Sequence, residues 1–185
     1  MNLITEFEDS PLFRFIYNNM SVFLNHPIRR MFNDPVKKVK AAGIHPGMYV
    51  LEVGCGSGYF TIPAAELVGD EGRLHAIDIH PKAVETVSSR VIDSNLRNVI
   101  ITKTNALDTG FPCESYDMIL LFGVIPAPVL PLKKLLPEMH RLLKPCGSMA
   151  VWTGLPLWSP KKVTRSRLFT YAGKRSGVHN FTRNS

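Results

Sequence analysis

A glycine-rich segment, Gly54-Cys55-Gly56-Ser57-Gly58, follows an apolar stretch that ends in Glu52-Val53. Glycines at the end of a strand let backbone N–H groups approach a ligand that a Cβ atom would exclude. The spacing fits neither common phosphate-binding loop, because a dinucleotide fingerprint needs glycine where Tyr59 stands and a Walker loop needs lysine after its last glycine. The segment favours a ligand site of another kind, although a tight structural turn would look the same.

A carboxylate, Asp78, stands at the end of the next predicted strand, 20 residues after the last of these glycines. In an open α/β sheet ligands bind outside the carboxyl ends of the strands, and an acidic residue at this place can accept hydrogen bonds from both ribose hydroxyls of an adenosine. The alternative is that Asp78 caps the helix predicted to begin near Pro81.

Two later strand ends lead to the same crevice. Asn105 and Ala106 follow the third predicted strand, where a side-chain amide and a backbone N–H can pair with an adenine edge. Taken alone, Asn105 is also an ordinary turn residue. Phe122 and Gly123 end the fourth strand and border the crevice.

Predicted strands and helices alternate along the chain, and they must position these residues. A parallel, doubly wound α/β sheet of the Rossmann type is therefore expected. A hairpin over 168–183 predicts that the sheet finishes with one antiparallel strand. The pattern predicts strands over 48–53, 74–77, 98–101, 116–122 and 148–153, and helices over 11–25, 35–42, 60–68, 81–91 and 132–143.

Composition bounds the class of protein. The 185 residues are 45% hydrophobic and 20% charged, which fits one compact domain and excludes a disordered, collagen-like or coiled-coil chain. Three cysteines without CxxC spacing argue against a disulfide scaffold and a zinc ribbon, so we expect a reducing, cytoplasmic location. No signal peptide is expected at the N-terminus. The apolar, uncharged run from Met118 to Leu132 is 15 residues long and too short to span a membrane.

The charge is concentrated at one end. Residues 1–153 hold 15 basic and 15 acidic side chains, whereas residues 154–185 hold seven basic ones and no acid, so the net charge of +7 lies in the last 32 residues. Such an end can meet an acidic partner, a phosphate backbone or a membrane surface, or it can simply be a solvated edge.

The chain resembles the class I S-adenosylmethionine-dependent methyltransferases, and within them the small-molecule branch that includes quinone-biosynthesis enzymes. The resemblance spans roughly residues 44–153 and implies a seven-stranded sheet with its last strand antiparallel. It divides the chain into an N-terminal helical lid segment, 1–43, and a cofactor-binding domain, 44–185. Five motifs carry it, in this order: Val50-Leu-Glu-Val-Gly-Cys-Gly-Ser-Gly58, His75-Ala-Ile-Asp-Ile79, Asn105-Ala106, Tyr116-Asp117-Met-Ile-Leu120 and Arg141-Leu-Leu-Lys-Pro-Cys-Gly147.

The resemblance also implies roles for single residues around S-adenosylmethionine. Glu52 would lie near the methionine amino group, and Asp78 would hold the ribose. Two positions depart from the family pattern: Asn105 stands where Asp is more frequent, and Cys146 stands where Gly is usual. The other implied contacts are the loop backbone at Gly54, Cys55, Gly56 and Gly58, Ile79 on the adenine face, Asn105 and Ala106 on the adenine edge, and Phe122 and Gly123 on the methionine side.

The methyl acceptor leaves fewer traces in the sequence. An apolar, proline-rich loop over 123–132 and the aromatic residues of the N-terminal helix (Phe13, Phe15, Tyr17 and Phe23) suggest two apolar lids and a small apolar or aromatic acceptor. No catalytic dyad is evident, so the catalytic residues stay unassigned. The candidates for a general base are His26, His80, His140 and Tyr17, each of which also reads as a surface or packing residue.

Other functions remain open at this point. The basic C-terminal region would suit an RNA methyltransferase, but the chain lacks an Asn-Pro-Pro-Tyr-type tetrapeptide after the fourth strand, and nucleic acid is not the expected partner. A non-catalytic cofactor-binding module and a nicotinamide-dependent reductase are the remaining alternatives. The histidines show no metal-ligand spacing, so no metal is expected. The oligomeric state is left open, a homodimer included.

Overall fold

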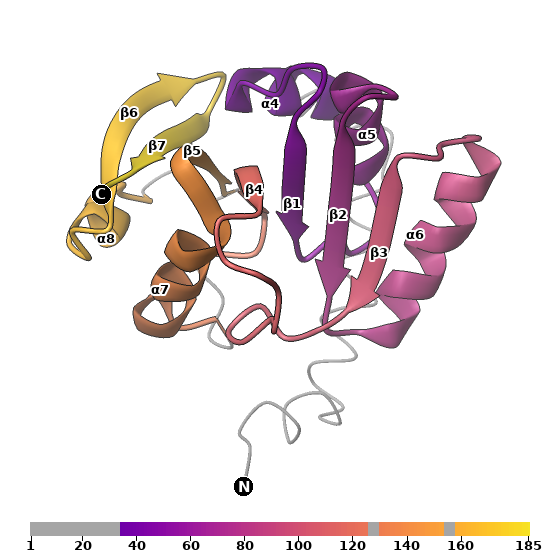
Figure 1. Ribbon diagram of the computed structural model, residues 1–185. Helices are drawn as coiled ribbons and strands as arrows, with labels where there is room; N and C mark the ends of the chain where they lie inside the picture. The colour runs from indigo at the N-terminus through magenta and orange to yellow at the C-terminus, as the bar shows by residue number, and fades with distance from the viewer. Residues whose placement is uncertain (1–33, 126–129, 154–157) are drawn as a thin grey trace, which may run out of the picture.

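The structure is a computed structural model that describes residues 34–125, 130–153 and 158–185 (Figure 1). The predicted helix over 11–25, the lid aromatics and the candidates Tyr17 and His26 lie outside the described residues. The helices are α4 (Pro35–Ala42), α5 (Thr61–Val68), α6 (Pro81–Asp93), α7 (Leu132–Leu142) and α8 (Lys161–Thr164). The strands are β1 (Tyr49–Val53), β2 (Arg73–Asp78), β3 (Val99–Lys103), β4 (Tyr116–Phe122), β5 (Leu143–Trp152), β6 (Phe169–Arg175) and β7 (Val178–Arg183).

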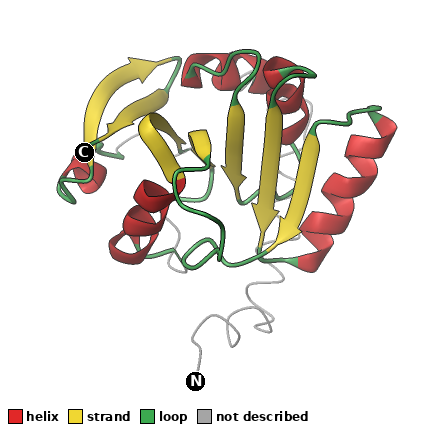
Figure 2. Ribbon diagram, viewed as in Figure 1, coloured by secondary structure: helices red, strands yellow, loops and turns green. Residues whose placement is uncertain are grey.

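The seven strands form one sheet in the order β3-β2-β1-β4-β5-β7-β6. Strands β1 to β5 pair in parallel, and β7 runs antiparallel to both of its neighbours, β5 and β6. The predicted mostly parallel, doubly wound sheet with one antiparallel strand is thus confirmed. Because the first two strands are neighbours and parallel, the loops that follow them meet at one edge of the sheet (Figure 2).

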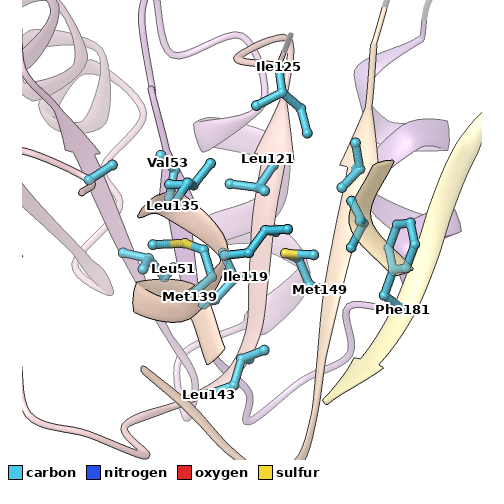
Figure 3. Close-up of a cluster of buried hydrophobic side chains, with 14 of the residues drawn as sticks. Leu51, Val53, Ile119, Leu121, Ile125, Leu135, Met139, Leu143, Met149 and Phe181 are labelled. Atoms are coloured by element: carbon cyan, nitrogen blue, oxygen red, sulfur yellow. The ribbon is translucent and has the colours of Figure 1, made fainter. Parts of the chain in front are cut away.

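The core lies on both faces of the sheet. Leu51 and Ile119 point to the face covered by α7, whereas Val50 and Leu120 point to the face covered by α4 and α5. This alternation explains why β4 reads as an unbroken apolar run, since neighbouring side chains are buried on opposite faces. Figure 3 shows the first of these clusters, with Leu135 and Met139 of α7 against β1 and β4.

The helix α4 begins and ends as the sequence predicts. The Asp34 carboxylate accepts hydrogen bonds from the backbone N–H groups of Val36 (2.9 Å) and Lys37 (3.3 Å), and Gly43 closes the helix at φ 98°. Its inner residues Val39 and Ala42 pack into the core with β1 and α5. The helix therefore packs against one face of the sheet.

The strand β5 begins earlier than expected. The sequence predicted that Pro145 and Gly147 would end the preceding helix and that the strand would start at 148. Instead, β5 starts at Leu143, directly after α7, and pairs first with Tyr116. The register then shifts, so that residues 144–147 bulge out of the ladder before Ser148 pairs with Met118. Cys146 lies in this bulge at φ 64°, a backbone conformation that favours the glycine usual at this position.

All three cysteines are free, Cys55 being buried and Cys113 and Cys146 exposed. None of the helices in the described ranges has the length and apolar character needed to cross a bilayer.

Candidate functional site

The glycine-rich segment turns away from β1 directly beside the end of β2. The backbone N–H groups of Gly54 and Cys55 both donate to the carbonyl oxygen of Ile77, at 2.8 and 3.0 Å. The N–H of Gly58 donates to the carbonyl oxygen of Cys55 at 2.8 Å and tightens the turn. These bonds fix the loop at the carboxyl edge of the sheet, below β1 and β2 in Figure 1.

Asp78 joins this loop to the start of α6. One carboxylate oxygen accepts a hydrogen bond from the backbone N–H of Gly56 (2.9 Å), and the other accepts from the N–H of His80 (2.9 Å). The residue that caps α6 is His80, whose ring nitrogen accepts from the N–H of Lys82 at 3.2 Å. Asp78 is therefore not the helix cap. A carboxylate offers about four lone-pair directions, so each oxygen of Asp78 retains acceptor capacity.

The glycines of the loop are required for different reasons. All three have a positive φ, which side chains rarely adopt: 74° at Gly54, 53° at Gly56 and 75° at Gly58. A Cβ on Gly54 would collide with Val124, and one on Gly58 would press on Val87 at 3.3 Å. Among the described residues, a Cβ on Gly56 would meet the Gly54 carbonyl oxygen alone, at 4.0 Å. The space over Gly56 is thus open to a ligand.

Glu52 is buried beneath the beginning of α5. It is 2% exposed, and one of its oxygens accepts a hydrogen bond from the hydroxyl of Thr61 at 2.6 Å. Thr61 was not among the residues singled out from the sequence. The available signal was a hydroxyl residue in the first turn of the helix that follows the glycine loop. The partnership itself needs the fold, because nine residues and a full turn of chain separate the two groups.

The acidic groups at this edge influence one another. Burial raises the pKa of Glu52 to about 8; the Thr61 hydroxyl opposes this, and the charge of Asp78 adds to it. Burial also raises the pKa of Asp78, against the N–H groups of His80 and Gly56. The pKa of the Cys55 thiol is raised by burial and then by both carboxylates. The edge is therefore a buried acidic site, which suits a ligand that carries positive charge.

Glu52 should make stability depend on pH. From about pH 4.5 to about pH 8 the folded protein keeps a proton on Glu52 that the unfolded chain releases, so the free energy of unfolding should fall as pH rises through this window. In Glu52→Gln that fall should be much smaller. Urea unfolding at a series of pH values measures it, with Glu66→Gln, an exposed glutamate of α5, as the control that retains the wild-type slope. Equal slopes in all three proteins would contradict the assignment.

The segment after β3 lies next to α7. The side-chain oxygen of Asn105 accepts from the backbone N–H of Leu107 (3.0 Å), which is the turn role that the sequence left open. Ala106 is 8% exposed and packs in the α7-side core. The segment is held further along, where the hydroxyl and the backbone N–H of Thr109 both donate to Glu138 of α7, at 2.7 and 3.0 Å.

The end of β4 lies beside the end of β5. The backbone N–H of Gly123 donates to the carbonyl oxygen of Trp152 at 2.8 Å, and Gly123 has φ 76°. The Phe122 ring is 4% exposed and packs edge-on against Phe60, with ring centres 5.0 Å apart. The backbone of Phe122, rather than its ring, is thus what the strand end offers a ligand. Ile79, which follows Asp78 in the chain just before α6, is partly buried.

Two of the general-base candidates are described. His80 caps α6 and lies close enough for its charge to lower the pKa of Asp78. His140 bonds through a ring nitrogen to the carbonyl oxygen of Asn184 (2.9 Å) and packs against Phe169. In the ranges that the structure covers, no three or more His, Cys, Asp or Glu side chains are grouped so that they could hold a metal ion.

Comparison with known proteins connects this geometry to a family. Residues 50–147 match the methyltransferase domain. Aklanonic acid methyltransferase DauC of Streptomyces sp. (strain C5) is 39% identical over 74 residues, which are 40% of this chain and 34% of that protein. Demethylmenaquinone methyltransferase of Listeria monocytogenes serotype 4a (strain HCC23) is 32% identical over 113 residues, 60% of this chain and 47% of that protein. The chain thus spans less than half the length of these relatives.

A solved structure shares the fold over nearly the whole chain. The crystal structure of a SAM-dependent methyltransferase from Aquifex aeolicus superposes with a TM-score of 0.73 and 24% identity, covering 89% of this chain and 96% of the other. The domain match extends over more than half of the 185 residues and includes the glycine loop, Asp78 and Asn105. The protein belongs to the class I S-adenosylmethionine-dependent methyltransferases.

Proposed function

We propose that this protein transfers a methyl group from S-adenosylmethionine to a small, apolar or aromatic acceptor. S-adenosylmethionine is the cofactor of the family, and when bound it supplies a methyl group that its sulfonium makes electrophilic. The observation that carries the proposal is the open space over Gly56. Gly56 lies between Glu52 and Asp78 in the chain, and its backbone N–H donates a hydrogen bond to the Asp78 carboxylate.

The residues of the site fit this donor. Asp78 would accept hydrogen bonds from the ribose hydroxyls with the acceptor capacity that Gly56 and His80 leave free. Glu52 would face the amino group of the methionine part, whose positive charge favours the ionised carboxylate. The backbone of the glycine loop, from Gly54 through Cys55 to Gly58, would lie along the amino-acid part of the donor.

The adenine and methionine sides of the donor complete the proposed site. Ile79 would lie against the adenine face. Asn105 would use the second lone pair of its side-chain oxygen at the adenine edge, beside the backbone N–H of Ala106. The backbone at Phe122 and Gly123 would border the methionine side. Each of these contacts is supported by the position of its residue after β2, β3 or β4.

The nature of the methyl acceptor is inferred from the relatives and from the loops near the site. The two relatives are named for aklanonic acid and demethylmenaquinone, which favours the small-molecule branch of the family. We further propose that, within the segment 1–43, the part that precedes α4 forms a lid over the domain 44–185, since α4 itself packs on the sheet, and that the loop over 123–132 lines the acceptor pocket. The cytoplasmic location belongs to the same proposal and is supported by three free cysteines. A homodimer is compatible with it.

The chain itself has little chemistry to perform. Holding the acceptor in line with the methyl group can contribute about 7–11 kcal/mol to lowering the barrier, whereas a general base is needed only if the acceptor must lose a proton. The sequence and the site accordingly assign no catalytic residue, and the apolar surroundings of the strand ends would serve to exclude water.

A screen with labelled methyl donor tests the proposal. The protein, S-adenosylmethionine labelled in its methyl group and a pool of small metabolites should yield a labelled small organic product. The same screen with a variant that lacks residues 1–25 should change which product forms while donor binding persists. Label found only in RNA, or donor binding without transfer to any acceptor, would overturn the proposed reaction.

A further inference from the structure

A second feature of the molecule lies away from the acidic site. Five cations gather where α4 meets the turn between β6 and β7, and we call them the basic cluster: Lys37, Lys38, Lys40, Lys174 and Arg175. Figure 1 shows this turn beside α4, although about 130 residues separate the two segments in the chain. The cluster is therefore a product of the fold, and only two of its five residues belong to the basic C-terminal region.

Direct contacts hold the two halves of the cluster together. The Lys38 ammonium donates to the carbonyl oxygen of Ser176 at 2.6 Å and lies 5.6 Å from the centre of the Trp152 ring. The Asn180 amide donates to the carbonyl oxygen of Ala41 at 3.2 Å. The Arg175 guanidinium comes within 3.4 Å of where a Cβ of Gly43 would be. The cations are thus placed on a fixed surface.

No carboxylate on the described part of the chain pairs with the cluster. The ion pairs found there all lie elsewhere: Arg141 with Glu138, Lys144 with Asp117, and Arg183 with Glu114. The acid nearest in sequence, Asp34, uses its carboxylate to cap α4. The pKa of Lys38 is lowered by burial and by the charges of its neighbours Lys37 and Lys174.

The surroundings of the cluster indicate which kind of anion fits. Proteins that bind single-stranded nucleic acid combine cations with exposed aromatic rings on which bases stack. The aromatic ring under Lys38 belongs to Trp152, which is only 5% exposed. The exposed aromatic residue of the hairpin, Tyr171, packs its ring against His179 and Phe181 and bonds through its hydroxyl to His179 at 3.2 Å. The exposed neighbour in the first turn of α4 is instead an aliphatic side chain, Val36, at 38%. Cations with an exposed aliphatic side chain are typical of a surface that meets anionic lipid headgroups.

A single side chain, Trp152, lies between the cluster and the end of β4. Trp152 ends β5, and its ring spans from 4.0 Å of the Gly123 Cβ position to 3.9 Å of that of Gly177, in the hairpin turn. Lys38 and the hairpin turn are therefore about one indole ring away from the strand end proposed to border the methyl donor. We propose that the basic cluster docks the protein reversibly on an anionic phospholipid surface. Docking would give the enzyme access to an apolar acceptor dissolved in the bilayer, and this purpose rests on the proposed function.

Vesicle co-sedimentation tests the docking without donor or acceptor. The wild type should bind vesicles that contain phosphatidylglycerol, bind pure phosphatidylcholine much more weakly, and be released by salt. The variant K37Q/K40Q/K174Q/R175Q removes four exposed charges and keeps Lys38, which joins the hairpin to α4. Its affinity for these vesicles should be lower by about tenfold or more, because each cation near an anionic surface contributes separately to the binding free energy.

A matched variant removes the same charge elsewhere. K133Q/K134Q/K161Q/K162Q changes four exposed lysines of α7 and α8 and should bind the anionic vesicles nearly as the wild type does. Equal loss in both variants, or wild-type binding that does not depend on phosphatidylglycerol, would overturn the docking. So would cluster-dependent binding to an oligouridylate RNA in place of vesicles. S-adenosylhomocysteine binding, measured on the same proteins, reports separately on the donor site: its absence would contradict the proposed function and leave the docking intact.

Discussion

Asp78→Asn should weaken the binding of S-adenosylhomocysteine by about tenfold or more, as measured by calorimetry. The substitution keeps the size of the side chain but removes its charge and one of its two acceptor oxygens, and hydrogen bonds to a charged group contribute about 1.5–3 kcal/mol each. It also places an amide N–H₂ against the backbone N–H of Gly56 or of His80, both of which now donate to the carboxylate.

A control of the same chemistry is available at the opposite edge of the sheet. Asp117, near the start of β4, accepts from the backbone N–H of Tyr49 (2.8 Å) and pairs with Lys144 (2.7 Å). Asp117→Asn should lower the free energy of unfolding but leave the affinity for S-adenosylhomocysteine unchanged. If the two variants lose affinity equally, or if Asp78→Asn binds as the wild type does, Asp78 does not hold the ribose.

Gly56→Ala should cost far more in ligand affinity than in stability. At φ 53° an alanine is strained by about 1–2 kcal/mol, but within the described ranges no atom beyond the neighbouring residues in the chain lies closer than 4.0 Å to the new Cβ. The protein should therefore still fold. The methyl group would occupy the space proposed for the donor, so the affinity for S-adenosylhomocysteine should fall by about tenfold or more, comparable with the loss of a charged hydrogen bond.

Gly110→Ala separates the two effects. Gly110 has φ 70° and is exposed, and no described residue beyond its chain neighbours has an atom within 4 Å of its Cβ position. Alanine there therefore carries a similar backbone strain away from the proposed site. Thermal unfolding should show similar losses of stability for both variants, and calorimetry should show weaker binding for Gly56→Ala alone. Unchanged affinity in Gly56→Ala would mean that the space over the loop is not used by the ligand.

Local signals predicted much of the fold. The strand β4 was predicted at its observed bounds because its apolar run is uninterrupted, and α4 because Asp34, Pro35 and Gly43 mark its two ends. The start of β5 was missed because proline and glycine ordinarily interrupt a ladder, whereas here the chain absorbs residues 144–147 in a bulge and resumes pairing.

The site was predictable in outline and not in its contacts. The glycine loop and Asp78 follow consecutive parallel strands, so topology alone brings them together. The bond between Thr61 and Glu52 and the inward turn of the Phe122 ring depend on how α5 packs on the sheet. The basic cluster depends on a contact between Lys38 and Ser176, 138 residues apart, which no local pattern reveals.

A crystal structure of the protein with S-adenosylhomocysteine would decide the central claim. We expect the ligand at the carboxyl edge of β1 and β2, with its ribose hydroxyls on the Asp78 carboxylate and its amino-acid part over Gly56. Density for the ligand at any other surface, or a fully saturated crystal in which side chains fill the space over Gly56, would refute the assignment of this protein as a methyl-donor enzyme of that geometry.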